Sequence, residues 1–211
     1  MSTQQPALFP MFIKLAGRAC LVVGGGPVAE GKIAGLLRSN ARVTVISSDL
    51  TAALAQSAQS GAITWKQKSF ELSDLNGVFL VVAATSSFET NALIYQEADR
   101  RGILCNAVDQ PRDCHFYYPA VVDRGPLQIA ISTAGLSPSL AQRLRKELEN
   151  QFGPEYEPWV EWLGRMRAVL MRKGIDFETR RRILGRLASR EVFDRLRGAS
   201  ERKLAREGEA A

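Results

Sequence analysis

ACLVVGGGPVA, residues 19–29, joins a short apolar run to a turn of three glycines and a proline. The run Ala19–Gly24 is rich in apolar and β-branched residues, which predicts a buried strand. Residues Val28–Leu37 then carry apolar side chains at helical spacing, so we expect a helix directly after the turn. A strand, a glycine turn and a helix in this order are typical of a dinucleotide-binding βαβ unit.

The glycine turn fits the pattern G-x-G-x-x-A, with Gly24, Gly26 and Ala29 at the small positions. Gly24 permits the tight turn, Gly26 leaves room for a pyrophosphate, and Ala29 lets the helix pack closely on the strand. Free N–H groups at the helix start, from Val28 onward, are expected to face the phosphates, and Pro27 is expected to lie beside them in the cofactor site. The alternative is a glycine turn with a purely structural role. Cofactor binding is favoured because a strand precedes the turn and a helix and a second strand follow it.

The end of the second predicted strand, Arg42–Ile46, indicates which dinucleotide is bound. Ser47, Ser48 and Asp49 follow it, about 20 residues after the glycines, where a ribose-binding side chain usually stands. No arginine accompanies them to meet a 2′-phosphate, so we predict NAD rather than NADP as the cofactor. Asp49 has an alternative role as the cap of the following helix.

Strands and helices alternate through the first half of the chain. The strands are apolar without alternation, which predicts a parallel sheet covered on both faces, an α/β Rossmann-like fold. Ala84 and Thr85 follow a strand of this sheet and are expected to line the cofactor crevice. The further predicted elements are the helix Leu50–Ser60, the strands Ile63–Lys66 and Val78–Ala83, the helix Thr90–Arg101 and the strand Ile103–Val108.

The pattern changes after Asp109. Ala120–Asp123 and Leu127–Ser132 flank a turn-rich linker and predict a β-hairpin. Ser137-Pro138 predicts a helix start, and from Glu155 onward only helices are predicted, with starts at Asp176 and Ser189. We therefore expect three parts: an NAD-binding Rossmann domain over residues 1–112, a small β-containing dimerisation segment over 113–148 and a C-terminal helical domain over 149–211, the last 13 or so residues charged and frayed.

Composition narrows the class of protein. The chain has 211 residues, 45% of them hydrophobic, which suits a packed core. It has no apolar run of about 18 residues that would span a bilayer, and its start lacks the pattern of a secretory signal. The three cysteines form no CxxC pair, which favours a reducing cytoplasm over a disulfide framework or a structural zinc site. The net charge of +6 falls mostly in residues 139–211, but no helix-turn-helix or aromatic-rich basic motif is present, so we expect no nucleic-acid partner.

Further motifs follow the glycine turn in order, and together they resemble one family. They are GGGPVAEGK at 24–32, AAT at 83–85, CNAVD at 105–109, FYYPA at 116–120 and GLSP at 135–138. The set is similar to precorrin-2 dehydrogenase, the N-terminal module of siroheme synthase, over roughly residues 12–148. No methyltransferase half is present, so the stand-alone form is expected.

The resemblance implies a concrete function. It implies NAD-dependent oxidation of precorrin-2 to sirohydrochlorin, with iron insertion to give siroheme in some members, by a homodimer whose middle segment forms much of the interface. The family's catalytic aspartate falls on Asp109. A serine near the family's active site falls on Thr133, beside Ser132, so the resemblance implies that Ser132 and Thr133 contact the tetrapyrrole substrate. Gly31 stands where family members often carry arginine.

Asp109 ends the strand Ile103–Val108, next to the predicted cofactor crevice. A carboxylate there can accept the proton released when a hydride moves to the nicotinamide. The alternative role is to cap the turn that Asp109 begins. His115, the only histidine, is suited to proton transfer near neutral pH, and its alternative is a surface-loop residue. Its neighbours Asp113 and Cys114 are badly spaced for a metal site, so none is predicted.

Two other functions are compatible with the Rossmann half. One is a dehydrogenase of another small acid, and the other is a non-catalytic module that senses NAD and gates a partner. The basic helices, with Arg180–Arg182, Arg186 and Arg190, would attract a polyanionic tetrapyrrole, and the alternative for them is an ordinary solvated face.

Overall fold

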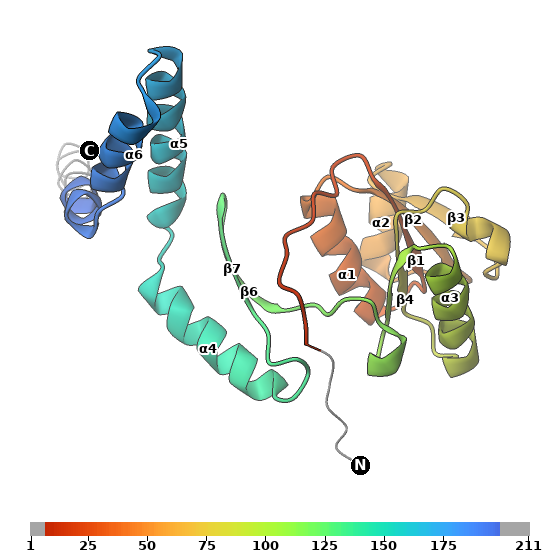
Figure 1. Ribbon diagram of the computed structural model, residues 1–211. Coiled ribbons are helices and arrows are strands. Elements are labelled where there is room, and N and C mark those ends of the chain that lie inside the picture. Colours follow the sequence, from red (N-terminus) through yellow and green to blue (C-terminus); the bar gives the residue numbers. More distant parts are fainter. Residues whose placement is uncertain (1–6, 199–211) are drawn as a thin grey trace, which may run out of the picture. The chain divides into compact units, whose positions relative to one another are not determined.

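The structure of the protein, a computed structural model, describes residues 7–198. Two compact units make up the chain, Met1–Tyr118 and Pro119–Ala211 (Figure 1). Within the described range, no helix is both long enough and apolar enough to cross a membrane. The segment 199–211, predicted to be frayed, lies outside the described residues. The division into three parts at residues 112 and 148 stays a prediction.

A five-stranded parallel sheet forms the centre of the first unit, in the order β3-β2-β1-β4-β5 (Figure 1). The chain builds outward from β1 in one direction and then in the other, so the order reverses between β1 and β4. Such a reversal opens a crevice at the carboxyl ends of the strands. The predicted Rossmann-like sheet is confirmed. The strands are β1 (Ala19–Val23), β2 (Arg42–Ser47), β3 (Thr64–Gln67), β4 (Leu80–Ala83) and β5 (Leu104–Ala107).

Helices cover both faces of this sheet, which explains why its strands are apolar without alternation. In β1, Cys20 and Val22 pack in the core under α1 and α2, whereas Leu21 and Val23 pack in the opposite core under α3. Each of these four side chains is nearly fully buried. The covering elements are α1 (Pro27–Arg38), α2 (Ala52–Gln59), the short 3₁₀ helix η1 (Leu72–Leu75) and α3 (Phe88–Arg100).

Two helices begin at other residues than predicted because of their caps. The hydroxyl of Ser87 accepts a hydrogen bond from the Thr90 N–H at 3.1 Å, so α3 starts at Phe88 rather than Thr90. The hydroxyl of Thr51 accepts from the Leu54 N–H at 3.3 Å, so α2 starts at Ala52. The alternative role of Asp49 as the cap of this helix is therefore wrong.

The outer edge of β5 is covered by the chain that follows it. After the 3₁₀ helix η2 (Pro111–Asp113), Cys114 pairs antiparallel with Asn106, and the His115 N–H donates to the Cys105 carbonyl at 2.8 Å. An open sheet edge invites pairing with another chain, so this return protects one end of the sheet.

The second unit contains the predicted hairpin, β6 (Ala120–Arg124) and β7 (Leu127–Ile131), which is antiparallel. Arg124 joins it to α4 (Pro138–Gln151), because its guanidinium donates to the carbonyls of Glu149 and Phe152 in the last turn of that helix. The next helices are α5 (Tyr156–Arg172) and α6 (Phe177–Leu187), and residues 190–198 are helical as well.

The predicted starts of these helices are confirmed. Ser137 precedes Pro138 and accepts from the Leu140 N–H, and Asp176 accepts from the Thr179 N–H at 2.9 Å. Ser189 accepts from the Val192 N–H at 3.4 Å ahead of residues 190–198. The hairpin and the helical segments therefore follow the local patterns that predicted them.

Candidate functional site

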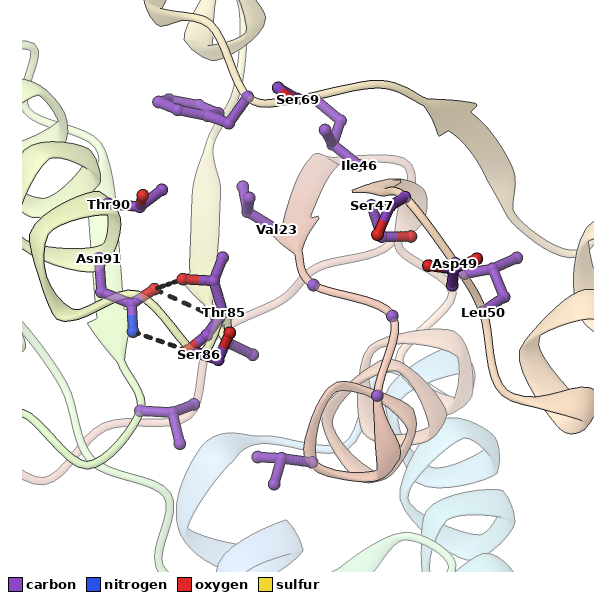
Figure 2. A pocket seen from close by; sticks show the side chains of 18 of the residues that line it. Val23, Ile46, Ser47, Asp49, Leu50, Ser69, Thr85, Ser86, Thr90 and Asn91 are labelled. Carbon is purple, nitrogen blue, oxygen red and sulfur yellow. Dashed lines mark hydrogen bonds between the residues drawn. The ribbon is translucent and has the colours of Figure 1, made fainter.

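A cavity of about 910 Å³ opens at the carboxyl edge of the parallel sheet in the first unit. This volume is in the range of cofactor sites, and the location is the one expected from the strand order. Figure 2 shows its two walls on either side of Val23: Ser47 and Asp49 on one side, and Thr85 and Asn91 on the other. The first wall follows β2, and the second follows β4.

The glycine turn after β1 lies between these walls. Gly24 has a φ of 124°, and a Cβ there would overlap the carbonyl oxygen of Ala84. A Cβ on Gly25 would overlap the carbonyl oxygen of Asp49. Gly26 is different, because its φ is −85° and a Cβ there would meet no atom within 4 Å. The first two glycines are therefore required by neighbouring backbone, whereas the third leaves open space.

The start of α1 has no side-chain cap, with Gly26 at the N-cap position and Pro27 in the first turn. The first hydrogen bond at this end runs from the Glu30 N–H to the Gly26 carbonyl at 3.0 Å. The N–H groups of Val28 and Ala29 precede it and have no acceptor within the helix. Such a helix start, next to open space, fits an anion such as a pyrophosphate.

The wall after β2 is held by the edge strand β3. The indole of Trp65 donates to the Ser47 hydroxyl at 3.1 Å, and the Gln67 amide donates to the Ser48 carbonyl at 3.0 Å. Asp49 is exposed, and among residues 7–198 its carboxylate has no hydrogen bond or ion pair. Its oxygens are available to a hydroxyl donor in the cavity.

The wall after β4 is fixed by a buried amide. Asn91, 3% exposed, accepts from the Thr85 N–H at 3.2 Å and from the Thr85 hydroxyl at 2.8 Å, and it donates to the Thr85 carbonyl at 3.2 Å. Figure 2 shows these bonds as dashed lines. Because three bonds link one side chain to one residue, the loop after β4 has a defined conformation, and Ala84, Thr85 and Ser86 line the cavity from it.

Asp109 lines the cavity directly after β5. Its φ is 59°, in the left-handed region that Asp and Asn tolerate better than most residues. Among the described residues its carboxylate makes no hydrogen bond, and the N-cap of η2 is Gln110. The structure thus shows no side-chain cap by Asp109.

Lys32 of α1 is a basic group that interacts electrostatically with Asp109. Its ammonium lies 3.6 Å from the centre of the Tyr118 ring. Burial lowers the pKa of Lys32, while the charges of Cys114 and Asp109 act in the opposite direction.

The cavity brings together most of the residues predicted from the sequence. Ala29 is the exception in the glycine motif, since it is fully buried between α1 and the sheet, as its packing role requires. Ser132 and Thr133 belong to the second unit, where their hydroxyls accept from the N–H groups of Ala134 and Ser137. The predicted residues that line the cavity are Gly24, Gly26, Pro27, Val28, Ser47, Ser48, Asp49, Ala84, Thr85 and Asp109.

Sequence reasoning missed a second group of lining residues. They follow β3 and β4, so the rule that the carboxyl ends of parallel strands share one edge was a signal that pointed to them. Asn91 was hidden because it lies inside a helix and acts through Thr85. The missed residues include Lys68, Ser69 and Phe70 after β3, and Ser86, Phe88, Thr90 and Asn91 after β4.

His115 does not line the cavity. The Cys105 N–H donates to its Nδ1 at 3.0 Å, which assigns the proton to Nε2, and Nε2 donates to Asp99 at 3.0 Å. Both ring nitrogens are thus engaged in joining the returning chain to β5 and α3. The ring has a structural role at the sheet edge.

The cysteines and acidic residues form no obvious metal centre. Cys20 and Cys105 are buried as predicted, and burial raises the pKa of their thiols to about 11 and about 12. Over residues 7–198, no three His, Cys, Asp or Glu side chains come together as metal ligands.

Comparison with known proteins gives family matches for both units. Residues 11–120 match the family model described as "Putative NAD(P)-binding", and residues 124–151 match the one described as "Sirohaem biosynthesis protein central". The resemblance to the siroheme synthase module is confirmed by these matches and by the relatives below.

Curated relatives are named siroheme synthases. The chain is 42% identical over 180 residues to siroheme synthase 1 of Aeromonas salmonicida, covering 85% of this chain and 38% of the relative. It is 39% identical over 186 residues to the siroheme synthase of Thioalkalivibrio sulfidiphilus, covering 88% of this chain and 38% of the relative. The chain thus spans well under half the length of these relatives.

Among solved structures, the chain is similar to "SirC, precorrin-2 dehydrogenase". The TM-score is 0.78 at 26% identity, and the match covers 97% of this chain and 100% of that one.

Gly26→Ala is expected to weaken binding of NAD by about tenfold or more, because the new methyl group enters the open space at the helix start. The backbone at Gly26 suits alanine, so the free energy of unfolding should change by less than about 1 kcal/mol. Gly24→Ala, by contrast, should cost more than about 2 kcal/mol, since it combines backbone strain with overlap at Ala84.

Urea denaturation and a fluorescence titration with NADH measure both effects. A Gly26→Ala protein that binds the nucleotide as tightly as the parent would contradict the proposed location of the pyrophosphate.

His115→Ala is expected to lower the free energy of unfolding by about 1–3 kcal/mol, because it leaves the Cys105 N–H without its side-chain acceptor at the sheet edge. Nucleotide affinity should be unchanged, since the ring lies outside the cavity lining. Asp99→Ala serves as the matched control, as it removes only the exposed bond to Nε2 and should cost less. A loss of affinity as large as that of Gly26→Ala would give His115 a role in the cavity.

Proposed function

The chain belongs to the NAD(P)-binding family whose model matches residues 11–120, and we propose that it is an NAD-dependent dehydrogenase that oxidises precorrin-2 to sirohydrochlorin. One observation supports this most strongly. The unpaired carboxylate of Asp109 lines the same cavity as the open glycine turn, so a proton acceptor and a pyrophosphate site share one space. The full-length similarity to SirC, named as a precorrin-2 dehydrogenase, supports the substrate.

The residues present fit a dinucleotide. The open space at Gly26 and the uncapped N–H group of Val28, which lines the cavity, suit the pyrophosphate. The carboxylate of Asp49 would bind ribose hydroxyls at the β2 wall, and Ser47 and Ser48 would shape that wall. Ala84 and Thr85 would line the nicotinamide half. NAD supplies a hydride acceptor when bound.

The position of Asp109 in the cavity lining supports a role for its carboxylate in proton transfer. Oxidation of the tetrapyrrole ring removes a hydride and a proton from the substrate, and the proton requires a base within hydrogen-bonding distance. The Asp109 carboxylate has no competing hydrogen bond among the described residues, so it can accept this proton or bind pyrrole N–H groups and position the ring. The left-handed backbone at Asp109 is the type of local strain that often accompanies functional sites.

Iron insertion is a second candidate activity, which the resemblance implies for some members of the family. Incubation of the protein with precorrin-2 and NAD, with and without Fe²⁺ or Co²⁺, tests both activities by absorption spectra. NADH formation without metal supports the dehydrogenase, and metal-dependent formation of a metallated product supports the chelatase. NAD binding without turnover would instead favour the sensor.

The second unit has features that suit a homodimer and an anionic substrate. A two-stranded hairpin is marginal alone, and β6 and β7 each have one edge unpaired among residues 7–198. We propose that a second copy covers these edges and that Ser132 and Thr133 contact the substrate. Arginines of α6 would attract its carboxylates. Three free cysteines suit the reducing cytoplasm.

Asp109→Asn is expected to lower turnover of precorrin-2 by at least about 100-fold, the scale of a general base, while NAD affinity persists. Asparagine retains the size of the side chain and tolerates the left-handed backbone. Asp109→Ala should also lose turnover, but it adds a backbone cost of about 1–2 kcal/mol to the free energy of unfolding. Steady-state kinetics and urea denaturation separate the two effects. Near-normal turnover of a folded Asp109→Asn enzyme would remove Asp109 from the mechanism.

Sedimentation is expected to give about twice the chain mass of 23.2 kDa. The physical reason is the pair of open edges on the β6–β7 hairpin, which a second copy can satisfy with main-chain hydrogen bonds. The measurement is sedimentation velocity over a hundredfold range of concentration. A monomer throughout this range would contradict the homodimer and leave the dehydrogenase proposal to the kinetic tests.

A further inference from the structure

Four charged side chains gather where β3 ends. The ammonium of Lys68, which lines the cavity, lies 2.9 Å from a carboxylate oxygen of Asp74 and 3.4 Å from one of Glu71. The ammonium of Lys66 lies 3.8 Å from the other carboxylate oxygen of Asp74. Two carboxylates thus face two ammonium groups, and one of those groups belongs to the cavity wall.

Asp74 is the fixed member of this cluster. Its side chain is only 6% exposed, and it accepts a hydrogen bond from the Glu71 N–H at 3.0 Å in addition to the Lys68 contact. Burial raises the pKa of Asp74, but the bonds from Lys68 and Glu71 and the nearby lysine charges outweigh it, and the pKa lies below its ordinary value. Asp74 is therefore a charged anchor toward which Lys68 is drawn.

The cluster adjoins the wall that follows β2. Gln67, the residue before Lys68, pairs in register with Ser47 and donates from its side chain to the Ser48 carbonyl. The end of β2 is where a Rossmann fold holds the adenosine ribose, and discrimination against a 2′-phosphate is made there. Lys68 is the one Lys or Arg among the described residues that line the cavity.

A lysine next to the wall that follows β2 would normally favour binding of a 2′-phosphate, and therefore of NADP. We propose that Asp74 and Glu71 hold the Lys68 ammonium away from the 2′ position, and that this ion-pair cluster makes the site select NAD over NADP. A phosphate approaching Lys68 meets two carboxylates, whose charges oppose it. The inference rests on the proposed nucleotide site and adds to it the element that determines cofactor choice.

Asp74→Asn tests the proposal directly. Asparagine can still accept the Glu71 N–H, so the fold of this turn is retained, while one of the two charges that hold Lys68 is removed. The ratio of the dissociation constants for NADP and NAD is expected to fall by about tenfold, the scale of one charge-assisted hydrogen bond. Glu71→Gln, at a side chain that is 67% exposed, should shift the ratio in the same direction by less. Titrations use NADH and NADPH fluorescence at low salt, with no tetrapyrrole.

Two controls assign the effect to Lys68. Adding Lys68→Met to Asp74→Asn should abolish the gain, because no ammonium remains at the wall. Lys66→Met removes the other lysine near Asp74, outside the cavity lining, and should leave the ratio unchanged. An unchanged ratio in folded Asp74→Asn, or a gain that survives Lys68→Met, would overturn the proposal. If Asp74→Asn does not fold, an unchanged ratio in Glu71→Gln overturns it.

These outcomes are distinct from failure of the proposed function. A parent protein that binds neither NADH nor NADPH contradicts the nucleotide site itself. A parent that binds NADH, with variants that keep its preference, contradicts only the role of the cluster. Precorrin-2 turnover does not enter either comparison.

Discussion

Two backbone segments meet at Gly24 with no space for a side chain, and much of the first unit depends on this approach. The carbonyl of Ala84 occupies the position that a Cβ of Gly24 would need, and the Ala84 N–H donates to the Val23 carbonyl at 2.8 Å. The loops after β1 and β4 are thereby held together at the point where the strand order reverses. The crevice there is open because the chain leaves these two strands in opposite directions. A larger residue at Gly24 would separate the loops and remove the floor of the cavity.

The helices α1, α2 and α3 differ in how their first N–H groups are capped. Thr51 and Ser87 cap α2 and α3, because each hydroxyl accepts a hydrogen bond from one N–H in the first turn of its helix. The start of α1 alone among these three lacks such a bond. Unpaired N–H groups near solvent bind water or an anion, and the macrodipole favours the anion. The fold thus leaves free N–H donors where Gly26 provides space, and this combination supports the proposal that the glycine turn binds the pyrophosphate.

The sequence was sufficient for features set by local pattern. Apolar runs such as Val78–Ala83 indicate a sheet buried on both faces, and the glycine spacing indicates the turn and the helix after it. What it missed depends on contacts between distant residues. Asp49 and Thr51 are both residue types that cap helices well, but Thr51 is the N-cap of α2. Its hydroxyl also donates to Glu30 of α1 at 2.6 Å, a tertiary contact that local sequence rules do not include. The role of Asn91 is not visible in the sequence for another reason: it lies inside α3, only six residues after Thr85, and no helical periodicity indicates that its side chain turns back to bind that loop.

The sequence predicts NAD because no arginine follows β2, whereas the structure indicates a different physical reason for the same preference. A cation is present at that wall, but it comes from the neighbouring strand and is held by Asp74. The residues that directly follow β2 in the sequence therefore do not include all the charged side chains at this edge, because the segment after β3 supplies Lys68 and Asp74. Over the assembled edge, the side chains of Asp49, Lys68, Asp74 and Glu71 carry a net negative charge, and the sum stays negative when Lys66 is included. Selectivity at such an edge depends on which carboxylate each ammonium faces, because a bound phosphate competes with those carboxylates for the same hydrogen bonds.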